Sequence, residues 1–244
     1  MFYYYGIDWT YIALVLPAIV FSLIASARVN STFKKYSQMQ NLRGMTGAQA
    51  AQRVLSANGI TGVRIERVSG DLTDHYDPKT NVIRLSDSVY NAATPAAVGV
   101  AAHEAGHAVQ YATNYAPIKI RAAIVNATNI GSRLSMPLIL IGILLMGVQS
   151  LAQYSEVFYY IALIGVFAYG LCVVFQLVTL PVEFNASRRA LSTIEQTNML
   201  GEAERIGAKK VLSAAAMTYV AALAVSLTQF LRLLMIVSSN RRRN

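Results

Sequence analysis

Two of the three histidines in the chain lie four residues apart, in the segment His103-Glu104-Ala105-Gly106-His107. On an α-helix this spacing places side chains one turn apart on the same face, so both imidazoles can bind one metal ion. Imidazole ligands suit zinc, which makes a bound water acidic enough to lose its proton near neutral pH. Glu104 could take that proton as the water attacks a carbonyl group, so the motif predicts a hydrolase with one catalytic Zn²⁺ ion.

A catalytic zinc ion takes three protein ligands and keeps one position open, so the motif needs a third ligand from elsewhere. The residues alone leave two candidates: His75, in the polar segment 70–81, and Glu183, at the end of an apolar run. His75 could also contact the substrate or stabilise the negatively charged oxygen of a transition state. Arg188 could do the same, although basic residues beside an apolar run are also typical of a membrane boundary.

The elements that must position these residues are predicted from local signals. Thr94-Pro95 is typical of a helix start, which predicts a helix that carries the motif and ends before Pro117. Thr46 and Gly59 are expected to bound an earlier helix. The segments 63–68 and 82–85 read as short strands, and we expect them to pair as a hairpin across the polar segment 70–81.

The remainder of the chain indicates a membrane protein. Its apolar fraction is 55% and its charged fraction only 14%, too few charges for an ordinary soluble domain. Uncharged apolar runs cover residues 9–27, 134–155, 157–182 and 211–231. Each run is long enough to cross a hydrocarbon core of about 30 Å, and we expect the second and third to form a tight hairpin. A single cysteine excludes a disulfide scaffold.

The basic residues predict an orientation for these runs. Residues 1–27 contain no Lys or Arg, whereas residues 28–133 contain twelve and residues 183–210 contain five. The two basic regions are therefore expected on the cytoplasmic side. If the last run spans, Arg241 to Arg243 lie outside, so that run could instead lie at the interface or meet a partner membrane protein or a second copy of the chain. No recognition motif accompanies the net charge of +9, so nucleic acid is not an expected partner.

The order of these features resembles the gluzincin membrane peptidases of the HtpX and CAAX prenyl protease type. In those families an H-E-x-x-H helix is followed by a transmembrane pair and then by an E-x-x-A-D motif. The closest resemblance is to the YugP-like membrane zinc metallopeptidases, on the segments LTDHYDP (72–78), AAHEAGHAVQ (101–110) and LPVEFNASRRAL (180–191).

The resemblance implies zinc ligation by His103, His107 and Glu183, with Glu104 as the base. Ser187 stands where the HtpX pattern has Asp, so a hydrogen bond to a ligand is weaker here or comes from another residue. Resemblance to other H-E-x-x-H peptidases also suggests that the strand at 82–85 is an edge strand that binds substrate by strand addition.

We therefore interpret the chain as an α-helical multi-pass membrane protein with a small α+β zincin-like cytoplasmic metallopeptidase region. The expected divisions are an N-terminal anchor (1–27), the peptidase region (28–133), a transmembrane hairpin (134–182), a cytoplasmic third-ligand helix (183–210) and a hydrophobic helix with a basic tail (211–244). The predicted activity is hydrolysis of peptide bonds in membrane or membrane-proximal proteins, at the plasma membrane of a bacterial cell.

Two alternatives stay open at this point. The first is a site-2-type intramembrane protease, because Glu104 is the one acidic or basic side chain between residues 95 and 115 apart from the histidines. Against it, that helix is rich in Ala and Gly rather than Leu and Ile, and the chain has no Asp-Gly pair for that family's second metal motif. The second alternative is a non-proteolytic membrane scaffold whose zinc site is structural.

Overall fold

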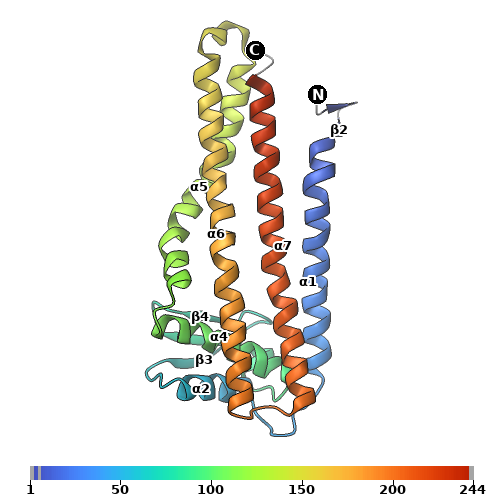
Figure 1. Ribbon diagram of the computed structural model, residues 1–244, viewed down its shortest axis with the longest axis vertical. Helices are drawn as coiled ribbons and strands as arrows, with labels where there is room; N and C mark the ends of the chain where they lie inside the picture. Colours follow the sequence, from blue (N-terminus) through green and yellow to red (C-terminus); the bar gives the residue numbers. More distant parts are fainter. Residues whose placement is uncertain (1–2, 5–6, 242–244) are drawn as a thin grey trace. The chain divides into compact units, whose positions relative to one another are not determined.

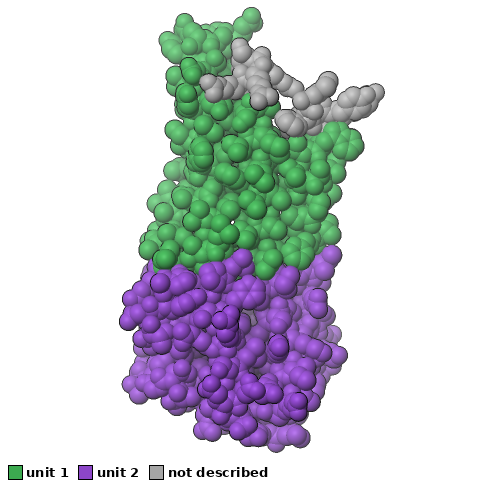
Figure 2. Space-filling view, in the orientation of Figure 1, with its two compact units in different colours: residues 1–23, 120–179, 219–244 green, residues 24–119, 180–218 purple. Residues whose placement is uncertain are grey.

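A computed structural model of the protein describes residues 3–4 and 7–241, and most of them are helical (Figure 1). The chain divides into two compact units, coloured separately in Figure 2. Unit 1 comprises residues 1–23, 120–179 and 219–244, and unit 2 comprises residues 24–119 and 180–218. The helices are α1 (Leu16–Ser37), α2 (Gly47–Ala57), α3 (Asp87–Tyr90), α4 (Pro95–Ala112), α5 (Ala116–Met146), α6 (Ser155–Gln196) and α7 (Glu202–Arg241).

Four helical segments of the described chain are long and apolar enough to cross a membrane, which confirms the prediction of four such segments. They are Tyr11–Ser37, Ala116–Met146, Gln149–Gln196 and Glu202–Asn240. The helix that carries the His-Glu-x-x-His segment, α4, is not one of these four candidates among the described residues.

The long helices extend beyond the predicted boundaries. Helix α5 begins at Ala116, well before the apolar run that starts at residue 134. Pro117 does not interrupt it, because proline is tolerated in the first turn of a helix. Helix α6 continues past Pro181 to Gln196, so Glu183 lies inside a helix rather than just beyond one. The range 183–210 is therefore not one helix: it holds the end of α6, a turn at 197–201 and the start of α7.

Unit 1 contains the α5–α6 hairpin over residues 120–179, α1 up to residue 23 and α7 from residue 219. Close approach of α5 to α6 depends on glycines, since a Cβ on Gly142 or Gly165 would lie 2.6–2.8 Å from a backbone oxygen of the neighbouring helix. The turn between the two helices contains a 3₁₀ helix, η2 (Gln149–Tyr154). Near the start of the chain, strands β1 (Tyr3–Tyr4) and β2 (Ile7–Asp8) pair ahead of a π-helical turn, η1 (Tyr11–Val15). Residues 242–244 of the expected basic tail lie outside the described residues.

Unit 2 contains a three-stranded sheet in the order β3-β5-β4, formed by β3 (Arg64–Val68), β4 (His75–Asp77) and β5 (Val82–Ser86). Strand β3 is parallel to β5, so the predicted hairpin between these two strands is wrong. The polar segment 70–81 itself supplies β4, which pairs antiparallel with β5 through a short turn. Strand β5 is consequently central, with Val82, Ile83 and Leu85 fully buried, and it is not the edge strand that we expected.

Helix α4 forms the core of unit 2. Thr94 caps it by accepting a hydrogen bond from the Ala97 N–H at 3.2 Å, and Pro95 occupies the first turn, as predicted. Its alanines, among them Ala101, Ala105 and Ala108, are buried among α2, α6 and α7 residues in one hydrophobic cluster. Thr46 begins α2 with a capping box, and Gly59 follows that helix at φ +66°, also as predicted. These small side chains allow α4 to pack closely against its neighbours.

Candidate metal centre

Three side chains from two helices converge in unit 2. His103 and His107 project from successive turns of α4, and Glu183 projects from α6. The Nε2 atoms of His103 and His107 lie 3.2 Å and 3.5 Å from Glu183 Oε2. The candidate ligand atoms of all three lie within 4.8 Å of one another, and their side chains are at most 14% exposed. These three residues could therefore hold one metal ion.

A glycine allows α6 to approach close enough for this convergence. A Cβ atom on Gly106 would lie 2.7 Å from the carbonyl oxygen of Ala186, closer than real contacts allow. Gly106 lies between the two histidines in sequence, and Ala186 lies three residues after Glu183. The contact therefore sets the separation of the helices at the level of the candidate ligands.

A second set of polar side chains holds the far nitrogen of each imidazole. Ser187 Oγ lies 3.0 Å from His103 Nδ1, and Gln110 Oε1 lies 3.0 Å from His107 Nδ1. The fully buried Gln110 amide donates to the carbonyl of Val182 at 2.7 Å and to Asn185 Oδ1 at 3.1 Å. Because its nitrogen donates, its oxygen must accept from the His107 Nδ1–H. This arrangement leaves the Nε2 lone pair of His107 free for a metal.

Burial and the neighbouring carboxylates act in opposite directions on the pKa of His107. Burial of the ring disfavours the imidazolium, but the hydrogen bond to Glu183 and the nearby charges of Glu104 and Glu183 outweigh it and raise the pKa of His107. A buried carboxylate facing two imidazoles is a favourable environment for a cation.

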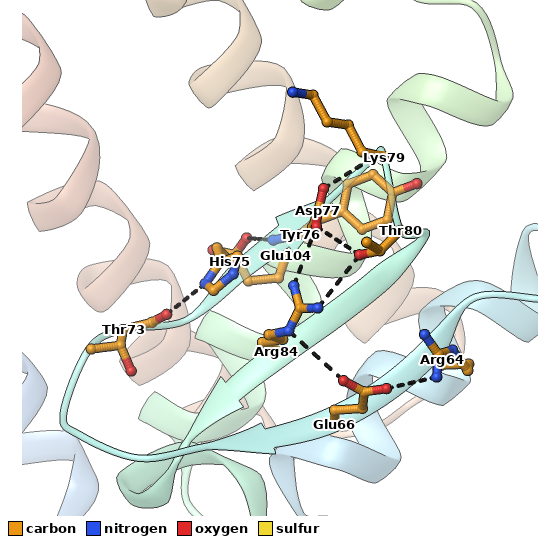
Figure 3. A network of polar contacts seen from close by, with 10 residues as sticks. All are labelled: Arg64, Glu66, Thr73, His75, Tyr76, Asp77, Lys79, Thr80, Arg84 and Glu104. Atoms are coloured by element: carbon orange, nitrogen blue, oxygen red, sulfur yellow. Dashed lines mark hydrogen bonds and ion pairs between the residues drawn. The ribbon is translucent and has the colours of Figure 1, made fainter.

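The Glu104 carboxylate lies beside the strand at the edge of the sheet. Its Oε2 accepts a hydrogen bond of 3.0 Å from the backbone N–H of Tyr76 in β4, drawn in Figure 3. Strand β4 pairs with β5 on one side only, and the Tyr76 N–H points to Glu104 rather than to β5. The free edge of β4 therefore faces Glu104.

Acidic residues hold β4 in this position. Asp77 accepts hydrogen bonds from the Thr80 hydroxyl, the Lys79 N–H and the Arg84 guanidinium, which together lower the pKa of Asp77 to about 2 (Figure 3). Asp74, just before β4, accepts from the Ser86 N–H at 2.7 Å, and its pKa is raised by burial and by the nearby charge of Glu104. The Asp77 contacts lie at the turn between β4 and β5, and the Asp74 contact joins the opposite ends of these two strands.

The other two candidates from the sequence lie apart from the converging ligands. His75 is exposed in β4, with Nδ1 2.8 Å from the Thr73 carbonyl oxygen, and the group of three candidate ligands does not include it. Arg188 is exposed and lines a cavity between α1, α6 and α7.

Sequence reasoning did not single out Gln110 or Tyr76. Gln110 could have been found, because it lies three residues after His107 and so shares its helix face. Tyr76 contributes a backbone N–H, for which residue type gives no signal. Its contact with Glu104 depends on the pairing of β4.

The paired histidines of α4 and the glutamate of α6 are arranged as a possible His-His-Glu metal site. The chain belongs to the family described as "Putative neutral zinc metallopeptidase", which matches residues 11–238. The "Putative membrane protease YugP" of Bacillus subtilis (strain 168) is 42% identical over 234 residues, which cover 96% of this chain and 99% of that relative. No solved structure matches the chain. The resemblance found in the sequence is thereby confirmed at the level of the family.

Proposed function

We propose that the protein is a membrane-anchored zinc metalloendopeptidase that cleaves membrane or membrane-proximal proteins at the cytoplasmic face. The observation that carries this proposal is the convergence of His103, His107 and Glu183 beside the Glu104 carboxylate. Two imidazoles and one carboxylate form a ligand set typical of catalytic zinc sites, which keep a further position open.

The ligand geometry fits zinc on chemical grounds. Both histidines have an Nδ1 partner within the protein, so both can present Nε2 to the ion, and Glu183 supplies the negative charge. A bound zinc ion would supply Lewis acidity, polarising the peptide carbonyl and making water more acidic.

Glu104 would then move the proton. Glu104 follows His103 directly in sequence, its carboxylate accepts a hydrogen bond from the Tyr76 N–H, and its charge acts on His107. We propose that a Glu104 oxygen accepts a proton from the attacking water and donates it to the nitrogen of the departing amine. Proton transfer of this kind contributes about 10²–10⁴-fold to the rate.

The free edge of β4 is the proposed binding site for the substrate backbone. An extended peptide that pairs with this edge would lie next to Glu104, because the Tyr76 N–H already points there. Main-chain hydrogen bonds of this type bind extended peptides with little regard to side chains. This assignment replaces β5, which is central in the sheet.

The cytoplasmic location is supported by charge. Unit 2 carries most of the basic residues that follow the first and third apolar runs, as the positive-inside rule expects of a cytoplasmic region. The intramembrane alternative has less support, because α4 is buried among protein side chains and is not a candidate span among the described residues.

The test is the E104Q variant of the purified full-length protein, with E202Q as the matched control at an exposed position. We expect E104Q to retain zinc and to lower kcat for an unfolded protein substrate by about 10²–10⁴-fold. E202Q should cleave the substrate with the kcat of the wild type, and a zinc chelator should abolish cleavage by the wild type and by E202Q. Equal cleavage by wild type and zinc-loaded E104Q would instead support a structural zinc site in a non-proteolytic scaffold.

A further inference from the structure

A cavity of about 950 Å³ lies in unit 2 between three helices. Its walls come from residues 28–36 of α1, residues 184–195 of α6 and residues 209–217 of α7. This volume is large enough for a small molecule or a lipid headgroup. The cavity is distinct from the converging metal ligands, since His103, Glu104, His107 and Glu183 do not line it.

Positive charge predominates around this cavity. Its lining includes the cations of Arg28, Lys35, Arg188, Lys209 and Lys210, all exposed. The carboxylate among the lining residues belongs to Glu195, which forms an ion pair with Arg205. In the part of the chain that the structure describes, none of the five cations has a carboxylate partner within ion-pair distance. The cavity therefore favours an anionic ligand.

The cations lie at the ends of three apolar runs. Arg28 directly follows the uncharged run 9–27, and Lys210 directly precedes the run 211–231. Arg188 is the first basic residue after the run 157–182. Each of three helices thus presents to one cavity the basic residue that lies nearest in sequence to its apolar run, the position at which basic residues meet the lipid phosphates of a membrane.

The remaining lining is amphipathic. Phe184 and Met217, which are 43% and 38% exposed, also line the cavity; Phe184 lies two residues after the run 157–182, and Met217 lies within the run 211–231. The hydroxyls of Thr32, Ser192 and Ser213 lie among the cations and can donate hydrogen bonds to phosphate oxygens. A ligand with a phosphate group and an attached acyl chain satisfies both kinds of wall. An acidic peptide would leave the apolar side uncovered.

We infer that this cavity binds the phosphate headgroup of an anionic phospholipid. The cations of α1, α6 and α7 neutralise the phosphodiester, the hydroxyls donate hydrogen bonds to it, and the acyl chains leave along Phe184 and Met217. Basic pockets between membrane helices bind lipid headgroups by this combination of charge and depth.

The cavity also reaches the metal centre through one side chain. Ser187 lines the cavity, and its Oγ lies 3.0 Å from His103 Nδ1. A headgroup in the cavity therefore lies against the side chain that orients this histidine. An influence of lipid on metal affinity rests on the proposed function, whereas lipid binding itself does not.

The test measures lipid binding by the full-length protein in neutral detergent, by titration with phosphatidylglycerol or with phosphatidylcholine of the same acyl chains. Native mass spectrometry counts the bound lipid. We expect phosphatidylglycerol to bind at least about tenfold more tightly than phosphatidylcholine, and R28Q/K210Q to lose about tenfold or more of that affinity. The preference should weaken as salt is raised.

The matched control is R43Q/R53Q, which removes two exposed cations of unit 2 away from the cavity. It should bind phosphatidylglycerol as the wild type does. S213W fills the cavity from an exposed position without changing charge, and should weaken phosphatidylglycerol binding. This variant decides the matter if R28Q/K210Q fails to fold.

Five results would overturn the inference, and the first four concern the two lipids, the variants and an acidic peptide. They are equal binding of the two lipids, a loss of affinity in R43Q/R53Q as large as that in R28Q/K210Q, and unchanged phosphatidylglycerol binding by S213W. The fourth is displacement of bound phosphatidylglycerol by a glutamate-rich peptide at a concentration below that of the lipid. Free glycerol phosphate that competes as well as the lipid would also overturn it, because the site would then belong to a soluble phosphate. None of these measurements requires peptidase activity, so the proposed function can fail independently.

Discussion

Each histidine of the α4 pair has one ring nitrogen toward Glu183 and the other toward a polar side chain. For His103 that side chain is Ser187, whose hydroxyl is a weaker acceptor than a carboxylate. We predict that S187A weakens zinc binding about 10–100-fold, the usual effect of losing the partner of a histidine ligand. S187D should bind zinc more tightly than S187A, because a carboxylate again accepts from Nδ1–H.

The measurement is zinc affinity by competition with a chelator, with S192A as the control for loss of an exposed serine on the same helix. Wild-type affinity in S187A would mean that the hydroxyl does not hold His103. Failure of S187D to improve on S187A would count against the role of the hydrogen bond acceptor.

The third ligand gives a second prediction for single residues. Glu183 Oε2 lies within 3.5 Å of both imidazoles, whereas His75 is exposed in β4. The E183Q variant should lose stoichiometric zinc after dialysis, because the amide has no negative charge to offset the ion. The H75A variant should retain one zinc per chain by atomic absorption. The reverse outcome would place His75 at the metal and would remove Glu183 from the site.

Between elements, the contact of α4 with α6 controls the site. A Cβ on Gly106 would lie 2.7 Å from Ala186 O, whereas one on Gly99 would meet the Ala208 Cβ of α7 at 3.3 Å. Both glycine-to-alanine changes gain about 1 kcal/mol of helix propensity, so their difference compares a severe backbone clash with a milder side-chain contact. We predict that G106A is destabilised by about 1–3 kcal/mol relative to G99A and binds zinc more weakly.

Thermal unfolding in detergent and zinc titration of the two variants test this prediction. Equal stability and equal zinc affinity would show that α4 and α6 can separate without consequence. A loss of stability with unchanged zinc affinity would show that the contact supports the fold alone.

Local signals explain how much of this arrangement the sequence predicts. The His-Glu-x-x-His spacing, the Thr94-Pro95 helix start and the four apolar runs each depend on residues close in the chain. The structure places them on helices as expected, except that residues 147–154 of the second run form the turn between α5 and α6. Strand β4 has only three residues, in a polar segment without hydrophobic alternation, so periodicity could not reveal it. The parallel pairing of β3 with β5 is non-local. The place of β4 beside Glu104 therefore required the structure.

Helix boundaries were hidden for a different reason. Hydropathy locates the ends of an uncharged segment, whereas a helix ends where its backbone hydrogen bonds end. The predicted divisions at residues 134 and 183 therefore fall inside α5 and α6. Pro181 also gives an ambiguous signal, because a helix in a bundle tolerates proline when neighbouring groups satisfy the freed carbonyls.

At the scale of the whole molecule, the basic C-terminal tail is the one group of basic residues that does not fit the predicted orientation. If the run 211–231 crosses the membrane, this tail lies outside the cytoplasm. Within unit 1, Arg232 Nε lies 3.0 Å from Asp8 Oδ2, and the Tyr11 ring lies 5.3 Å from the guanidinium carbon. Asp8 precedes the first apolar run and Arg232 follows the last one. The segment just before α1 therefore contacts α7 beyond the run 211–231, which supports a complete crossing by that run.

This orientation gives a prediction for the intact cell. In a C172S background, a cysteine replacing Asp71 lies in unit 2, and one replacing Gln153 lies in the α5–α6 turn; both positions are exposed. A membrane-impermeant maleimide should label Q153C on intact cells and D71C only after lysis, with the C172S parent as the unlabelled control. A cysteine appended after residue 244 should behave as Q153C does. Labelling of D71C on intact cells would place the metal centre outside the cytoplasm, and an appended cysteine that is protected until lysis would mean that α7 does not cross.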